Sequence, residues 1–145
     1  MKGFPESRGR RIVRERSGGL CELDGFRPAE SWSHRIARSR GGTWAPSNGL
    51  ATCGDGVRLC HGWLEANPTW AGEGRWHIRR LHQANPLDIP VYLRPLDLEP
   101  GWFLLDDEGG RWPVDPADYG LPVMPAHFPP SAARPLHTVP WVDPQ

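Results

Sequence analysis

Hydrophobic and polar positions follow a helical pattern in two short stretches of the chain. Residues 7–19 place Ile12 and Val13 among arginines and end in a glycine pair, which predicts a short basic helix with a glycine stop. A second helix is predicted from about Cys60, ending before Pro68 because proline disfavours helix in the preceding residue. The basic segment has a plain alternative, a solvated N-terminal tail.

Other stretches have the alternation and the β-branched or aromatic residues that are typical of strands. Residues 30–36, 76–79 and 91–93 are predicted strands, and residues 39–42 a turn. Residues 102–112 predict a β-hairpin, with acidic residues and a glycine pair between two aromatic segments.

A chain of 145 residues is about the size of one domain with extensions. Seventeen glycines and 17 prolines indicate much loop and turn. Prolines recur from Pro113 onward, which favours an extended or disordered tail. The expected organisation is a basic N-terminal arm or helix (1–20), a core that carries the site (21–70), an appended β subdomain (71–112) and a proline-rich tail (113–145).

The formal net charge is zero, but residues 1–60 contain 11 Lys and Arg against six Asp and Glu. A basic half indicates where a nucleic acid would bind. Three cysteines and the lack of a signal-like N-terminus argue against a secreted disulfide framework. No apolar run approaches the roughly 18 residues of a membrane helix. We therefore expect a soluble, cytoplasmic protein with thiols available for metal and no membrane partner.

The order of residue types between positions 33 and 63 is the most informative feature of the sequence. His34 and Asn48 are 14 residues apart, and Asn48 and His61 are 13 apart. The surrounding string is Ser33-His34-Arg35, Arg38-Ser39-Arg40-Gly41-Gly42, Pro46-Ser47-Asn48-Gly49-Leu50, Cys53 and Cys60-His61-Gly62-Trp63. It resembles the HNH endonuclease family, in the compact form found in bacteriophages of actinobacteria, over about residues 10–112.

The resemblance implies an α+β fold with a ββα-metal core, the His-Me finger, and the small β-hairpin or sheet appended to it. It also implies hydrolysis of phosphodiester bonds in DNA. In this interpretation His34 is the general base, since imidazole titrates near neutral pH. His61 binds a divalent ion, Mg²⁺ or Mn²⁺ or else Ni²⁺ or Zn²⁺, which stabilises charge on the phosphate. Asn48 hydrogen-bonds the loop behind His34 and fixes its ring.

One position departs from the family pattern. Ser33 stands where relatives have an acidic residue or histidine as a second metal ligand, and a hydroxyl is a poor ligand. Glu65, one helical turn after His61, is the candidate replacement. An alternative assignment makes His34 itself a ligand.

The cysteines suggest a second, structural site. Relatives hold zinc with two Cys-x-x-Cys pairs, whereas this chain offers Cys21, Asp24, Cys53 and Cys60, a chemically possible zinc set. The alternative is that the cysteines are only buried and that Asp24 opens a turn with Gly25.

Arginines flank the first histidine and could position DNA through its phosphates; these are Arg35, Arg38 and Arg40. Trp32, Trp44 and Trp63 are predicted to lie in the core. The function expected is a metal-dependent DNA endonuclease, phage-encoded and linked to genome packaging beside terminase proteins. The alternatives are a non-catalytic, zinc-organised DNA-binding module and a homing or restriction nuclease.

Overall fold

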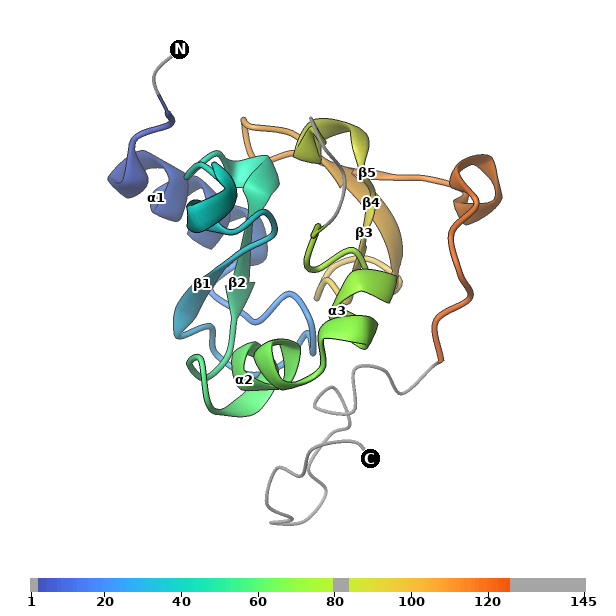
Figure 1. The fold of residues 1–145 in the computed structure, drawn as a ribbon, viewed down its shortest axis with the longest axis horizontal. Coiled ribbons are helices and arrows are strands. Elements are labelled where there is room, and N and C mark those ends of the chain that lie inside the picture. Colours follow the sequence, from blue (N-terminus) through green and yellow to red (C-terminus); the bar gives the residue numbers. More distant parts are fainter. Residues whose placement is uncertain (1–2, 80–83, 126–145) are drawn as a thin grey trace.

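The computed structural model describes residues 3–79 and 84–125. Within these ranges the chain is mixed α and β, with three α-helices and two small antiparallel sheets. Figure 1 shows the two sheets on opposite sides of the molecule, with two helices between them at the lower edge. The α+β class is therefore confirmed. None of the helices in the described ranges has the length and apolar character needed to span a membrane.

Helix α1 (Glu6–Ser17) is the predicted basic helix, and Gly18 ends it in the left-handed conformation. It is not a free tail, because it packs on β2 and buries Arg16. The Arg16 guanidinium forms an ion pair with Glu22 at 2.7 Å and donates to the Pro46 and Gly49 carbonyls. The solvated-tail alternative is wrong.

Strands β1 (Ser31–His34) and β2 (Gly49–Thr52) form the first sheet, an antiparallel pair with Ser31 opposite Thr52 and His34 opposite Gly49. The connection between them turns at the Gly-Gly pair. Gly41 has φ 89°, and a Cβ on Gly42 would collide with the Ile36 carbonyl, so both positions require glycine. Helix α2 (Leu59–Ala66) follows, with the bounds predicted for it, and then α3 (Pro68–Glu73).

The second sheet has the order β3-β4-β5 and contains the predicted hairpin. Its strands are β3 (Val91–Leu93), β4 (Gly101–Leu105) and β5 (Arg111–Pro113). Residues 76–79 are not a strand, contrary to prediction. Their backbone N–H groups bond singly to other segments, as His77 does to Ala71 and Ile78 to Arg35, so no ladder forms.

One apolar core joins both sheets. Its buried members come from β2, α2, α3, β3, β4 and the loop after α1, and Trp63 and Trp76 meet edge to face at 5.8 Å between ring centroids. Met124 also belongs to it, with Val114 and Leu121 packed alongside. Residues 71–112 therefore share the core of the preceding segment. Residues 113–125 include a 3₁₀ turn (Pro116–Tyr119), and three of their side chains contact the core, so this part of the predicted tail is attached to the domain. The remainder, 126–145, lies outside the described residues.

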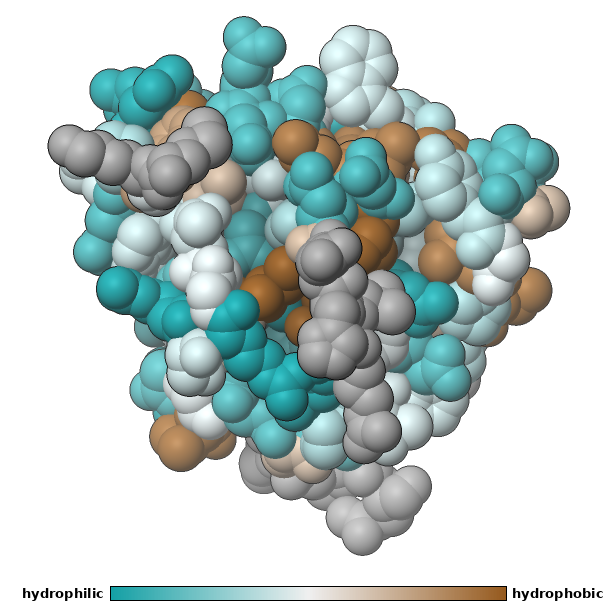
Figure 2. All heavy atoms as spheres, turned by 45° about the horizontal axis from the view of Figure 1, so that its top comes forward, coloured by the Kyte–Doolittle hydropathy of each residue, from teal (hydrophilic) through white to brown (hydrophobic). Residues whose placement is uncertain are grey.

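The surface drawn in Figure 2 is mainly hydrophilic, with hydrophobic groups in small separate patches. Large exposed hydrophobic side chains are likewise spread over several elements; they include Val57, Trp70, Leu96, Trp112 and Val123. Single exposed hydrophobic residues are ordinary on protein surfaces.

Candidate functional site

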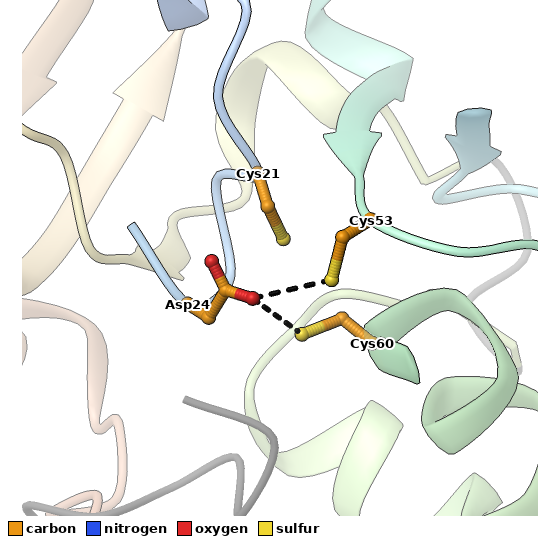
Figure 3. A group of neighbouring side chains, drawn as sticks. All are labelled: Cys21, Asp24, Cys53 and Cys60. Atoms are coloured by element: carbon orange, nitrogen blue, oxygen red, sulfur yellow. Dashed lines mark hydrogen bonds between the residues drawn. The ribbon is translucent and has the colours of Figure 1, made fainter. Parts of the chain in front are cut away.

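The four predicted metal ligands converge. Cys21 lies just after α1, Asp24 in the following turn, Cys53 directly after β2 and Cys60 in the first turn of α2. Their ligand atoms all lie within 4.8 Å of one another, and all four residues are buried (Figure 3). Among the residues that the structure describes, no other group of three or more His, Cys, Asp or Glu side chains brings its donor atoms this close together.

Asp24 serves the turn and the cluster at the same time. Its Oδ1 accepts hydrogen bonds from the backbone N–H groups of Phe26 and Arg27, at 2.9 and 3.0 Å. Its Oδ2 lies 3.2 Å from Cys53 Sγ and 3.5 Å from Cys60 Sγ (Figure 3). Asp24 therefore does open a turn, as the alternative interpretation held, and the same turn orients its second oxygen toward the thiols.

The electrostatics of the cluster favour a bound cation. Burial raises the pKa of Asp24 to about 6 and raises the pKa of Cys21 and Cys60 as well. Hydrogen bonds from Cys21 and Cys60 lower the pKa of Cys53. Without a cation, Cys21 and Cys60 therefore stay protonated, whereas a metal ion would stabilise their thiolates beside Cys53 and Asp24. Three thiolates and one carboxylate oxygen are a donor set that suits Zn²⁺, and the cluster could hold a metal such as zinc.

A second polar region is a hollow of about 490 Å³ between the end of β1, the 3₁₀ turn Arg38–Arg40, α2 and residues 77–79. The side chains that matter for chemistry there are His34, His61, Glu65, His77, Arg38, Arg40 and Arg79. Both predicted histidines and the predicted Glu65 thus share one hollow. Ser33 also lines it but is only 1% exposed.

His61 is held by the strand pair. Its Nδ1 lies 2.7 Å from Ser31 Oγ on β1, and its backbone N–H donates to the Cys53 carbonyl at 3.1 Å. Burial lowers the pKa of His61, so the imidazole is neutral at neutral pH. A neutral imidazole is the form that binds metal.

His34 ends β1 with its ring against Trp32 and Trp44, at 5.6 and 4.5 Å between ring centroids. The Trp32 indole N–H donates to His34 Nδ1 at 3.1 Å, while Nε2 is buried and has no hydrogen-bond partner in the described part of the chain. Burial, followed by the charges of Arg38 and Arg10, lowers the pKa of His34. His34 is therefore neutral, with its Nδ1 lone pair engaged by tryptophan.

Asn48 ties together the loop behind His34. Its Oδ1 accepts from the Ile36 N–H at 2.7 Å, and its Nδ2 donates to the Ile36 and Thr43 carbonyls at 3.1 and 3.0 Å. The Asn48 carbonyl accepts from the Arg35 N–H, next to His34. The hydrogen bonds to the loop that were predicted for Asn48 are present, and the residue is buried.

Arg35 does not face DNA, and its assignment to the phosphate-binding arginines is wrong. The residue is 1% exposed, and its guanidinium donates to main-chain carbonyls, at 3.0 Å for Arg75 and Ser47 and 2.8 Å for Ile89. Burial lowers the pKa of Arg35 to about 9, which leaves it charged at neutral pH. Arg35 is a structural cation that joins the loop of the first sheet to the segment before β3.

Arg38 and Arg40 are exposed, as their predicted role requires. Arg38 lies over the Trp44 ring at 5.4 Å, and Arg10 of α1 lies over the same ring at 4.8 Å. Trp44 also contacts His34. Two guanidinium groups from distant parts of the sequence thus gather beside His34. Trp32 and Trp63 are buried as predicted, whereas Trp44 is only partly buried.

Sequence reasoning missed His77. The residue is 8% exposed, burial lowers its pKa to about 4, and its Nε2 lies 3.5 Å from Glu65 Oε2. Its position 16 residues after His61 gave no helical or motif spacing, because α3 and a turn bring it back to α2. The available signal was a third histidine close to the string, in a segment interpreted as a strand.

Comparison with known proteins assigns no family: no family model matches the chain, and neither the curated proteins nor the solved structures provide a match.

Proposed function

We propose that this protein is an HNH-type nuclease that uses a divalent metal ion to hydrolyse phosphodiester bonds in DNA. The observation that carries the proposal is the order of elements around one hollow. His34 ends β1, Asn48 precedes β2 and braces the connecting loop, and His61 lies on α2 across the hollow. In this proposal β1, β2 and α2 form the ββα-metal core.

The residues fit a catalytic cation through their donor set. His61 is neutral and Glu65 is a carboxylate on the same face of α2, and their side chains line one hollow. A divalent ion bound there would act as a Lewis acid toward a phosphate oxygen. Glu65 compensates for Ser33, whose hydroxyl is a poor ligand.

His34 is the proposed general base. Its lowered pKa keeps it unprotonated at rest, as a base must be. To accept the proton of the attacking water at Nδ1, it must exchange the hydrogen bond from the Trp32 indole for one from water. Arg38 and Arg10 beside it are suited to hold the phosphate in position without reading the DNA sequence.

The cysteine cluster supports a second part of the proposal, a structural zinc ion. A closed set of four protein ligands is typical of structural zinc, whereas catalytic zinc keeps an open position. By its resemblance, the protein would act in phage genome packaging, with terminase or packaging proteins as partners.

The test is incubation of the purified chain with supercoiled plasmid and Mg²⁺, Mn²⁺, Ni²⁺ or Zn²⁺ in turn. We expect nicked or linear DNA with Mg²⁺ or Mn²⁺ and none in excess EDTA. Cutting at full rate in chelator, or no cutting with any of these metals, contradicts the proposal.

A second function has two observations in its favour. Ser33 replaces the expected ligand, and the Trp32 indole engages the lone pair of the proposed base. A non-catalytic, zinc-organised DNA-binding module would tolerate both. Tight DNA binding without cutting under every metal tested would identify this second function.

A further inference from the structure

Ser31 on β1 holds the ring of His61, which lines the hollow, through a small hydrogen-bond network. Its Oγ lies 2.8 Å from the Gly54 carbonyl, 3.4 Å from the Thr52 carbonyl, 3.0 Å from Thr52 Oγ1 and 2.7 Å from His61 Nδ1. A hydroxyl group has one proton to donate and two lone pairs to accept with. The four partners therefore compete for one proton and two lone pairs, and the nearer carbonyl, that of Gly54, is the better acceptor of the proton.

The Gly54 carbonyl can only accept a hydrogen bond, so the Ser31 proton belongs to it. Only the lone pairs of Ser31 Oγ then remain for His61. A bond of 2.7 Å to a lone pair requires that His61 Nδ1 is the donor. Neutral His61 consequently has its proton on Nδ1 and a free lone pair on Nε2.

The other two histidines of the hollow have the opposite arrangement. His34 Nδ1 accepts from the Trp32 indole at 3.1 Å. His77 Nδ1 lies 3.2 Å from the Arg79 guanidinium, which can only donate. In both neutral rings the proton is therefore on Nε2, and in His77 this nitrogen lies 3.5 Å from Glu65 Oε2.

We propose that Ser31 is a positioning residue that fixes the tautomer of His61 and so makes His61, rather than His34 or His77, the imidazole ligand of a divalent cation in the hollow, with Glu65 beside it. This inference rests on the metal site of the proposed function. It favours His61 over the alternative in which His34 is a ligand. His77 in turn holds Glu65 through its Nε2–H.

Tautomers can be read directly by long-range ¹H–¹⁵N NMR of the zinc-loaded full chain at neutral pH, with resonances assigned through single histidine variants. We expect the proton on Nδ1 in His61 and on Nε2 in His34 and His77. The two opposite results within one spectrum are an internal control. A proton on Nε2 of His61 overturns the proposal, whether or not any variant folds.

The second measurement is Mn²⁺ affinity, followed by paramagnetic broadening of the His61 signals without DNA. Ser31→Ala should weaken Mn²⁺ binding about 10–100-fold, the usual effect of losing a group that orients a ligand. Ser31→Thr keeps the hydroxyl and should restore affinity. Ser33→Ala removes a hydroxyl from the same strand and is the matched control, which should change affinity little.

The outcomes separate this inference from the nuclease proposal. Unchanged Mn²⁺ affinity in Ser31→Ala, with normal DNA cutting, contradicts the role of Ser31 but supports the nuclease proposal. Mn²⁺ bound through His61, with the predicted tautomers but no cutting of DNA, supports the role of Ser31 and contradicts the nuclease.

Discussion

The cysteine cluster and the histidine hollow both use residues at the start of α2, yet they differ in access to solvent. The four residues of the cluster are between 0% and 5% exposed. In the hollow the Glu65 side chain is 52% exposed. A closed ligand set cannot admit a substrate, whereas an open one can. In the proposed function the first region therefore serves stability and the second serves chemistry.

Adjacent residues of α2 connect the two regions. Cys60 belongs to the cluster and His61 to the hollow, and the His61 N–H bonds to the Cys53 carbonyl. A metal held by Cys53 and Cys60 would therefore fix the start of α2 and, with it, the position of His61. The structural region should control the geometry of the chemical one, while changes in the hollow should leave the cluster intact.

Removing one ligand of the cluster should have the largest effect. Structural zinc contributes about 10–16 kcal/mol in small zinc domains, so Cys53→Ser should lose bound metal and fold poorly. Elemental analysis and circular dichroism measure this. Asp24→Asn also removes a ligand but keeps an oxygen for the Phe26 and Arg27 N–H groups, so it should lose metal with less damage to the turn. A Cys53→Ser protein with unchanged stability and metal content would show that the cluster holds no structural ion.

Replacing His34 and replacing His61 should impair cutting in different ways, while the cluster keeps its metal. His34→Ala should lower the cutting rate about 10²–10⁴-fold with Mn²⁺ still bound, since general bases contribute about that factor. His61→Ala should weaken Mn²⁺ binding, and a higher Mn²⁺ concentration should partly restore its rate. Plasmid kinetics over a range of Mn²⁺ concentrations distinguish them. If metal rescues His34→Ala instead, then His34 is a ligand.

The local pattern predicted most elements because their signals are local. The glycine pair after α1, the turn residues between β4 and β5, and the proline after α2 each act within a few residues. The cysteine set was also found from residue types alone. The role of Arg35 could not be predicted from local pattern, because its partners lie 40 or more residues away. The role of His77 could not be predicted either, because it depends on a turn that brings the chain back to α2. Met124 likewise joins the core from within a proline-rich stretch.

Replacing Asn48 tests whether the hollow depends on the loop that supports it as well as on its reactive groups. Asn48→Ala removes three side-chain hydrogen bonds, and each buried group left without a partner costs about 1–3 kcal/mol. We expect a lower melting temperature and a rate between those of wild type and His34→Ala. Ser47→Ala, the buried neighbour, is the control. A fully stable Asn48→Ala protein would mean that the loop does not need this brace.

The arginines around Trp44 should give the smallest and most specific effect, on DNA binding alone. Arg38→Gln and Arg10→Gln each remove one charge beside His34. Arg11→Gln is the control, because Arg11 is an exposed arginine of α1, like Arg10, but does not lie over Trp44. The slope of log affinity against log salt should become shallower by about one for each phosphate that an arginine no longer neutralises. Fluorescence anisotropy with duplex DNA in EDTA measures binding without cutting. We expect the slope to fall for Arg38→Gln and Arg10→Gln and to stay near wild type for Arg11→Gln. Equal changes in all three variants would mean that α1 attracts DNA only through its total charge, and that the arginines at Trp44 form no phosphate site.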